Sequence, residues 1–207
     1  MNLTFNQVEA VFAQRFGIPS EKAVAFRGRL QHLQRLNFPS GVNTGRGKKA
    51  NYGWVQVIQL MVVLDLIDLG ITPDVAARGV KQGTDRLMDA VCSVISGFET
   101  GEALAKALTK ARCPFGITQM AIASAYALTL MHGRDEPTLI LTQTGREFTD
   151  QLNKDPAIEP AAAFINLGSR MMLVGQMIGR VVPLDPIEVA MELFKWSGDW
   201  AEQGSVS

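Results

Sequence analysis

The chain of 207 residues is poor in the side chains that usually bind metals or perform covalent catalysis. It has two cysteines, Cys92 and Cys113, and two histidines, His32 and His132. Neither pair has the spacing of a metal-binding motif, so we predict no metal site and interpret both thiols as inert core groups in a reducing compartment. The nucleotide-binding patterns GxxxxGK[ST] and GxGxxG are also missing. We therefore expect neither a cofactor nor an enzyme.

Long apolar runs are missing as well. The most apolar stretch, Val57–Leu64, is far too short to cross a bilayer, and Asp65 and Asp68 follow it closely. We interpret these two carboxylates as the solvent edge of the helix that carries them. Residues 1–20 have neither the basic start nor the apolar centre of a secretory signal. These observations predict a cytoplasmic protein that has no membrane partner.

The charges that are present are unevenly distributed, although the net charge of the chain is zero. Residues 1–52 carry eight basic and two acidic side chains, a net charge of +6. The remaining residues carry twelve basic and eighteen acidic side chains, a net charge of −6. An excess of positive charge at one end is typical of proteins that bind a polyanion.

Hydrophobic spacing predicts two helices near the N-terminus, at about residues 5–16 and 21–37. They are separated by the short turn Gly17-Ile18-Pro19. Two helices joined in this way are a candidate helix-turn-helix. The inward stripe of the second helix is expected to comprise Ala23, Val24, Phe26, Leu30, Leu33 and Leu36.

A basic, glycine-rich loop follows, with the sequence SGVNTGRGKKANYG in residues 40–53. We expect a two-stranded wing here, formed by Val42–Thr44 and Lys49–Tyr52 around a tight turn. The next helix is predicted over Trp54–Leu69 and ends at Gly70. A further helix should begin at Pro73 and continue to about Ser96, with weak points at two glycines.

The second half has a weaker pattern. It predicts helices and two strands, Thr138–Thr142 and Ala161–Asn166. The expected helices cover residues 102–111, 167–181 and 186–196. The fold class expected is mainly α: an N-terminal winged helix-turn-helix in residues 1–82 and a C-terminal helical or small α+β domain, for dimerisation or sensing, in residues 83–207.

The polar face of the second helix and the basic loop are suited to DNA. Arginine and glutamine match the edges of guanine and adenine in the major groove, whereas basic loop residues suit phosphates or a narrow minor groove. The alternatives are a solvated helix surface and a loop that binds phosphate alone. The candidate DNA-binding residues are Arg27, Arg29, Gln31, His32, Gln34, Arg35, Thr44, Arg46, Lys48, Lys49 and Tyr52.

The segment from the loop onwards, NTGRGKKANYGWVQVIQLMVVLDLIDLGITPDVAARGV, resembles the wing and following helices of the MerR-type winged-helix family. Tyr52 at the end of a basic wing, the long helix, Gly70 and Thr72-Pro73-Asp74 match the family pattern, and LQRLNF resembles the exit from its recognition helix. The resemblance covers about residues 5–82 and implies DNA binding by the same surface. The chain departs from the family in a longer second helix, in His32-Leu33 where a tyrosine pair is usual, and in having no evident coiled-coil helix.

The function expected is that of a sequence-specific DNA-binding transcriptional regulator, with the recognition helix in the major groove and the wing on the backbone. Its partner would be double-stranded DNA, bound as a homodimer because one module of this size buries little surface. The C-terminal half leaves room for a small-molecule effector. The alternatives are a phage or mobile-element factor, such as an excisionase or packaging adaptor, and an enzyme in the C-terminal half.

Overall fold

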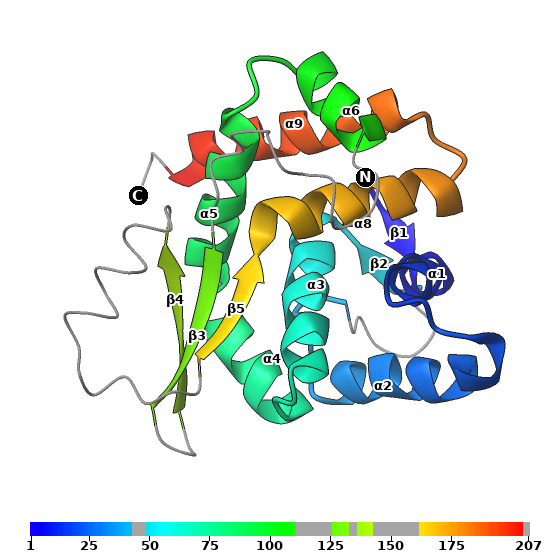
Figure 1. Cartoon of the computed structure of the whole chain (residues 1–207), viewed down its shortest axis with the longest axis vertical. Helices are drawn as coiled ribbons and strands as arrows, with labels where there is room; N and C mark the ends of the chain where they lie inside the picture. The colour runs from blue at the N-terminus through cyan, green and yellow to red at the C-terminus, as the bar shows by residue number, and fades with distance from the viewer. Residues whose placement is uncertain (43–48, 111–125, 133–135, 143–161, 205–207) are drawn as a thin grey trace.

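The computed structural model describes residues 1–42, 49–110, 126–132, 136–142 and 162–204, and within these ranges the chain is mainly helical. Helix α3 (Trp54–Asp68) lies in the middle, and other helices surround it (Figure 1). The predicted helical class is therefore confirmed.

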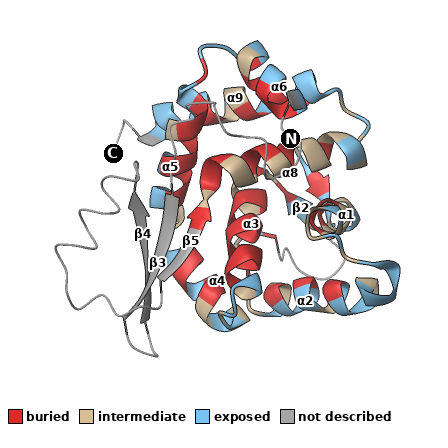
Figure 2. Cartoon of the chain, viewed as in Figure 1, coloured by how far each residue is buried: buried red, intermediate tan, exposed pale blue. Residues whose placement is uncertain are grey.

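Helix α3 is central because its sequence is apolar on every side. Every residue from Val57 to Leu66 is buried, which is the pattern of a helix enclosed by protein (Figure 2). At its start, the Gly53 amide donates a 3.0 Å hydrogen bond to Oε1 of Gln56. At its end, Gly70 adopts a φ of 95°, which side chains other than glycine rarely tolerate. The predicted end of this helix at Gly70 is confirmed.

The two expected N-terminal helices are present as α1 (Phe5–Arg15) and α2 (Ala23–Arg35). Thr4 begins α1 with a capping box, in which its hydroxyl accepts from the Gln7 amide and the Gln7 side chain accepts from the Thr4 amide. A single 3-10 turn, Ser20–Lys22, precedes α2 and delays its start by two residues relative to the prediction.

The strand pairing at the expected wing differs from the prediction. Strand β2 (Asn51–Tyr52) pairs antiparallel with β1 (Leu3–Thr4), so its partner is the segment before α1. Val42 belongs to no strand, and residues 43–48 lie outside the described ranges. The pairing therefore ties the residues just before α3 to the N-terminus, a long-range contact that local sequence patterns do not encode.

The helix expected over residues 73–96 is two helices, α4 (Pro73–Gln82) and α5 (Thr84–Ser96). The chain changes direction at Gly83, one of the two predicted weak points, where glycine lowers helix stability. The Thr84 hydroxyl accepts a 2.7 Å hydrogen bond from Nε2 of Gln59. This bond connects the start of α5 to the side of α3.

The C-terminal half supplies the remaining helices and one small sheet. The antiparallel sheet has the order β4-β3-β5, and β5 leads directly into α8. Both strands predicted in this half are present. The elements are α6 (Gly101–Lys110), β3 (Tyr126–His132), β4 (Glu136–Thr142), β5 (Ala162–Asn166), α8 (Leu167–Val181) and α9 (Pro186–Gly204).

One continuous cluster of buried residues runs through the described parts of both halves. It joins Leu3 and Phe12 near the N-terminus to Met171 and Leu193 near the other end of the chain. The packing therefore crosses residue 82. The division into a DNA-binding domain in residues 1–82 and a dimerisation or sensing domain in residues 83–207 stays a prediction. Among the described helices, none combines the length and the apolar character needed to span a membrane.

Candidate nucleic-acid interface

The inward face of α2 fixes this helix against the core. Phe26, Leu30 and Leu33 are buried at helical spacing, and burial of such side chains stabilises each by about 1.5–3 kcal/mol. The rings of Phe16 and Phe26 lie 6.4 Å apart, beside the turn between α1 and α2. Gly17 in this turn has a φ of 58°, a conformation that glycine adopts readily. The opposite face of α2 is thus held in a defined direction.

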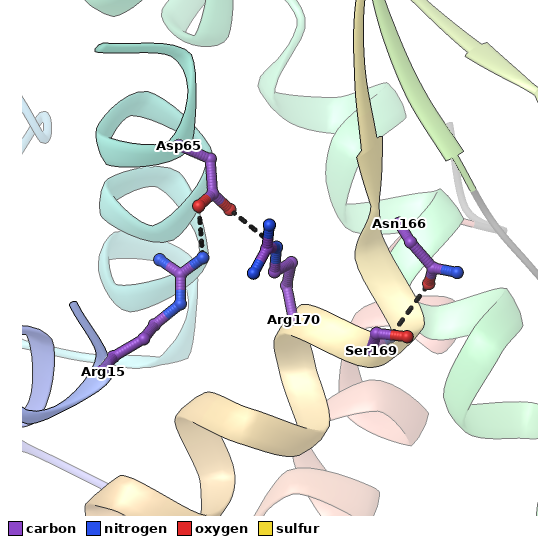
Figure 3. Close-up of polar contacts among 5 residues, drawn as sticks. All are labelled: Arg15, Asp65, Asn166, Ser169 and Arg170. Carbon is purple, nitrogen blue, oxygen red and sulfur yellow. Dashed lines mark hydrogen bonds and ion pairs between the residues drawn. The ribbon is translucent and has the colours of Figure 1, made fainter. Parts of the chain in front are cut away.

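A buried charge cluster holds α1 against α3 and α8 (Figure 3). Arg15 of α1 forms an ion pair with Oδ1 of Asp65, and Nε of Arg170 in α8 lies 3.4 Å from Oδ2 of the same carboxylate. The side chains of Arg15 and Asp65 are only 3% and 5% exposed. Asn166 fixes the start of α8 by accepting a 2.9 Å hydrogen bond from the Ser169 amide.

This cluster corrects the interpretation of Asp65 as a residue at the solvent edge. Asp65 is buried because Arg15, fifty residues earlier in the chain, compensates its charge. Burial raises the pKa of the Asp65 carboxyl and lowers the pKa of the Arg15 guanidinium. Both directions indicate that the loss of hydration outweighs the attraction between the two groups.

One flank of α2 is bonded to β2. Nε2 of Gln34 donates a 2.7 Å hydrogen bond to the Tyr52 hydroxyl, and the Tyr52 side chain is 1% exposed. Burial raises the pKa of this hydroxyl, and the bond from Gln34 partly opposes the rise. The expectation of a direct DNA contact from Tyr52 does not fit this burial. The pair instead sets the position of β2 beside the helix.

Another side chain of the predicted set, Arg27, is bound to α1. Its Nη1 lies 3.0 Å from Oε2 of Glu9, and its Nη2 donates a 3.3 Å hydrogen bond to Asn6. The guanidinium carbon is 5.3 Å from the centre of the Phe5 ring, within the range of a cation–π contact. The side chain is still 47% exposed, so Arg27 lies at the edge of the surface rather than at its centre.

The outward face of α2 has a different character. Four of the predicted residues on it are exposed and, within the described part of the chain, have neither a hydrogen bond nor an ion pair. They are Gln31, His32 and Arg35, together with Arg29, which is exposed at the edge of this face, beside the buried stripe. Figure 2 shows α2 at the margin of the molecule, with buried and exposed residues alternating along it.

Val24 corrects another expectation. It was assigned to the inward stripe, but its side chain is 82% exposed. At 100° per residue it lies about 160° from Phe26, on the face that carries Gln31 and Arg35. A helical projection of residues 23–35 could have detected this, since Val24, Gly28, Gln31 and Arg35 follow the spacing i, i+4, i+7, i+11.

The predicted loop residues Thr44, Arg46 and Lys48 lie outside the described residues. Lys49 is described and exposed. It precedes Tyr52 by three residues, so an extended chain places it within roughly 10 Å of the tyrosine that is bonded to α2. The described end of the basic loop is therefore close to the Gln34 flank of the helix.

The charges of the described helices are polarised. Helix α2 carries three arginines and no acidic residue, whereas α9 carries four acidic residues and one lysine. The two helices lie at opposite ends of the molecule (Figure 1). Of these two helices α2 is the positive one, and a polyanion would be attracted to it rather than to α9. Among the described residues, no group of three or more His, Cys, Asp or Glu side chains could hold a metal ion.

Comparison with known proteins adds no relative to these observations. No protein-family model, curated protein or solved structure matches the chain. The candidate interface therefore rests on geometry alone: an anchored helix whose outward face combines exposed arginine, glutamine and histidine side chains.

Proposed function

We propose that this chain is a sequence-specific transcriptional regulator that inserts α2 into the major groove of double-stranded DNA. In this proposal α1 and α2 form a helix-turn-helix, and the basic loop before β2 acts as a wing on the phosphate backbone. The observation that carries the proposal is the outward face of α2. Its arginine, glutamine and histidine side chains make no polar contact with the described part of the chain, while the opposite face is anchored in the core.

The chemistry of this face supports DNA over a neutral partner. Gln31 offers the paired donor and acceptor that match adenine, and Arg29 and Arg35 suit guanine edges or phosphates. Helix α2 itself contains three arginines and no acidic residue, and this composition also favours a polyanion. An ordinary solvated helix surface carries charges of both signs, so it does not account for the lack of acidic residues on α2.

The anchoring of α2 supports a specific rather than a purely electrostatic contact. The buried stripe restrains the helix on its inward side, and the Gln34–Tyr52 bond and the Arg27–Glu9 pair restrain it along one flank. Side chains held on a rigid element keep the geometry that base recognition requires. We further propose that the chain binds as a homodimer, because one helix of this size contacts a short site only.

The proposal is tested by fluorescence anisotropy with the full chain and a 30-base-pair duplex pool whose centre is randomised. We expect binding that weakens steeply as the salt concentration rises, and enrichment of a defined motif after repeated selection. Absence of binding at low salt would refute DNA binding altogether. Binding without enrichment would refute the regulator and favour the alternative, an architectural factor that reads the backbone alone.

A further inference from the structure

Val24 is the most exposed of the large hydrophobic side chains that the structure describes, at 82%. It is the second residue of α2 and contributes almost nothing to the core of the chain. A single exposed apolar residue needs no explanation by itself. Its position is unusual, however, because the residues that follow it at helical spacing on this face are Gly28, Gln31 and Arg35, which are polar or have no side chain.

Gly28 lies one turn further along the same face. Glycine within a helix is destabilising relative to alanine, so an internal glycine usually has a packing reason. Within the described part of the chain no such reason is found, because a Cβ added at Gly28 would meet no atom outside the backbone of its own helix within 4 Å. The described residues therefore leave this clearance open to a partner.

We propose that Val24 contacts the 5-methyl group of a thymine in the major groove, and that Gly28 lets the helix approach the base edges closely enough for this contact. This inference rests on the proposed DNA binding and specifies what the helix reads. Thymine is the one base that presents a methyl group in the major groove, and apolar side chains are its usual partners. Recognition helices contact bases with their N-terminal residues, where Val24 lies.

The geometry also gives a distance between two recognised bases. Val24 and Gln31 are seven residues apart on one face, which corresponds to roughly 10 Å along the helix axis. At roughly 3.4 Å per base pair, this spans at most about three base pairs, the value for a helix axis parallel to that of the duplex. The recognised thymine should therefore lie within about three base pairs of the adenine that Gln31 contacts.

The test uses the duplex selected by the full wild-type chain and a series in which one thymidine at a time is replaced by deoxyuridine. Deoxyuridine pairs like thymidine but lacks the methyl group. We expect one thymine position in each half-site at which the wild type binds the uracil duplex about fourfold more weakly, the value of one buried carbon group. The Val24→Ala variant should bind the thymine and uracil duplexes equally at that position.

Two further variants make the result specific. Ile187→Ala removes a 52% exposed apolar side chain from α9, far from α2, and should keep the fourfold discrimination. Gly28→Ala should raise Tm by about 2–4 °C and yet weaken binding at least about fivefold, because the added methyl group occupies the approach path. A merely structural role for Gly28 cannot give these opposite signs.

The outcomes separate this inference from the proposed function. If the wild type binds the selected duplex but loses no affinity at any uracil position, or if Val24→Ala keeps the discrimination, the methyl contact is refuted while DNA binding stands. If Gly28→Ala binds as tightly as the wild type, the close approach is refuted. If the wild type binds no duplex at low salt, both proposals fail.

Discussion

The buried pair Arg15–Asp65 gives a sharp prediction about stability. Removing one partner leaves the other as an unpaired charge with its side chain at most 5% exposed, which costs about 3–5 kcal/mol. We therefore expect Asp65→Leu to lower the free energy of unfolding by that amount. Arg15→Met should cost less, because Arg170 remains 3.4 Å from the carboxylate and is itself partly exposed.

The double variant Arg15→Met/Asp65→Leu should behave differently from the sum of its parts. Burial shifts the pKa values of both groups against their charged forms, so the pair stabilises the fold less than packed apolar side chains would. We expect the double variant to be at least as stable as the wild type, with a coupling free energy above about 3 kcal/mol. Chemical denaturation of the four proteins measures this cycle.

The exposed pair Asp74–Arg78 is the matched control. It has an ordinary 2.8 Å contact, but its side chains are 65% and 48% exposed. The same double-mutant cycle with Asp74→Leu and Arg78→Met should give a coupling below about 1 kcal/mol. Equal coupling at the two pairs, or a double Arg15/Asp65 variant as unstable as Asp65→Leu alone, would refute the reasoning.

The same cycle should depend on pH through the Asp65 carboxyl. The folded pKa of Asp65 is raised above the unfolded value near 3.8, so its protonated form is favoured by folding. The stability that this carboxyl contributes is fully present below the unfolded pKa and is lost as the pH rises through the folded pKa. Relative to the double variant, the wild type should therefore lose stability as the pH increases above about 4.

Three further predictions follow from single contacts. Burial raises the pKa of the Cys92 thiol to about 12. In a Cys113→Ser background, a thiol reagent should therefore label Cys92 slowly at neutral pH and rapidly in denaturant. Fast labelling of the folded protein would contradict the burial of this thiol. Tyr52→Phe removes the bond from Gln34 and should cost about 0.5–1.5 kcal/mol by thermal unfolding, and a large loss of DNA affinity at unchanged stability would instead make Tyr52 a DNA contact. Arg27→Ala should cost less than about 1 kcal/mol in stability and should weaken binding to all duplexes equally. A changed sequence preference would instead show that Arg27 contacts bases.

Local patterns predicted most of the helices. Apolar spacing located α1, α2 and α3, and Gly70 ended α3 where its backbone freedom suggested. These features depend on residues within a few positions of one another. The same holds for the outward position of Gln31, His32 and Arg35, which follows from the buried stripe on the other side of the helix.

The errors share a different origin, because they depend on contacts between distant parts of the chain. Tyr52 pairs with Leu3, and Asp65 is compensated by Arg15 and approached by Arg170. No sequence pattern near Asp65 indicates an ion-pair partner fifty residues away. Val24 is the exception. Helical geometry alone predicts its exposure, but its apolar side chain led to its assignment to the inward stripe.

The salt dependence of DNA binding tests the central claim most directly. The variant Arg29→Gln/Arg35→Gln removes two exposed charges from α2, and Arg86→Gln/Arg180→Gln removes two exposed charges elsewhere. If both arginines of α2 contact phosphates, the slope of log K against log salt should decrease in magnitude by about 1.8 for the α2 variant and remain unchanged for the control. Equal slopes for the wild type and the α2 variant, with equal affinity and sequence preference, would contradict recognition of DNA by this helix.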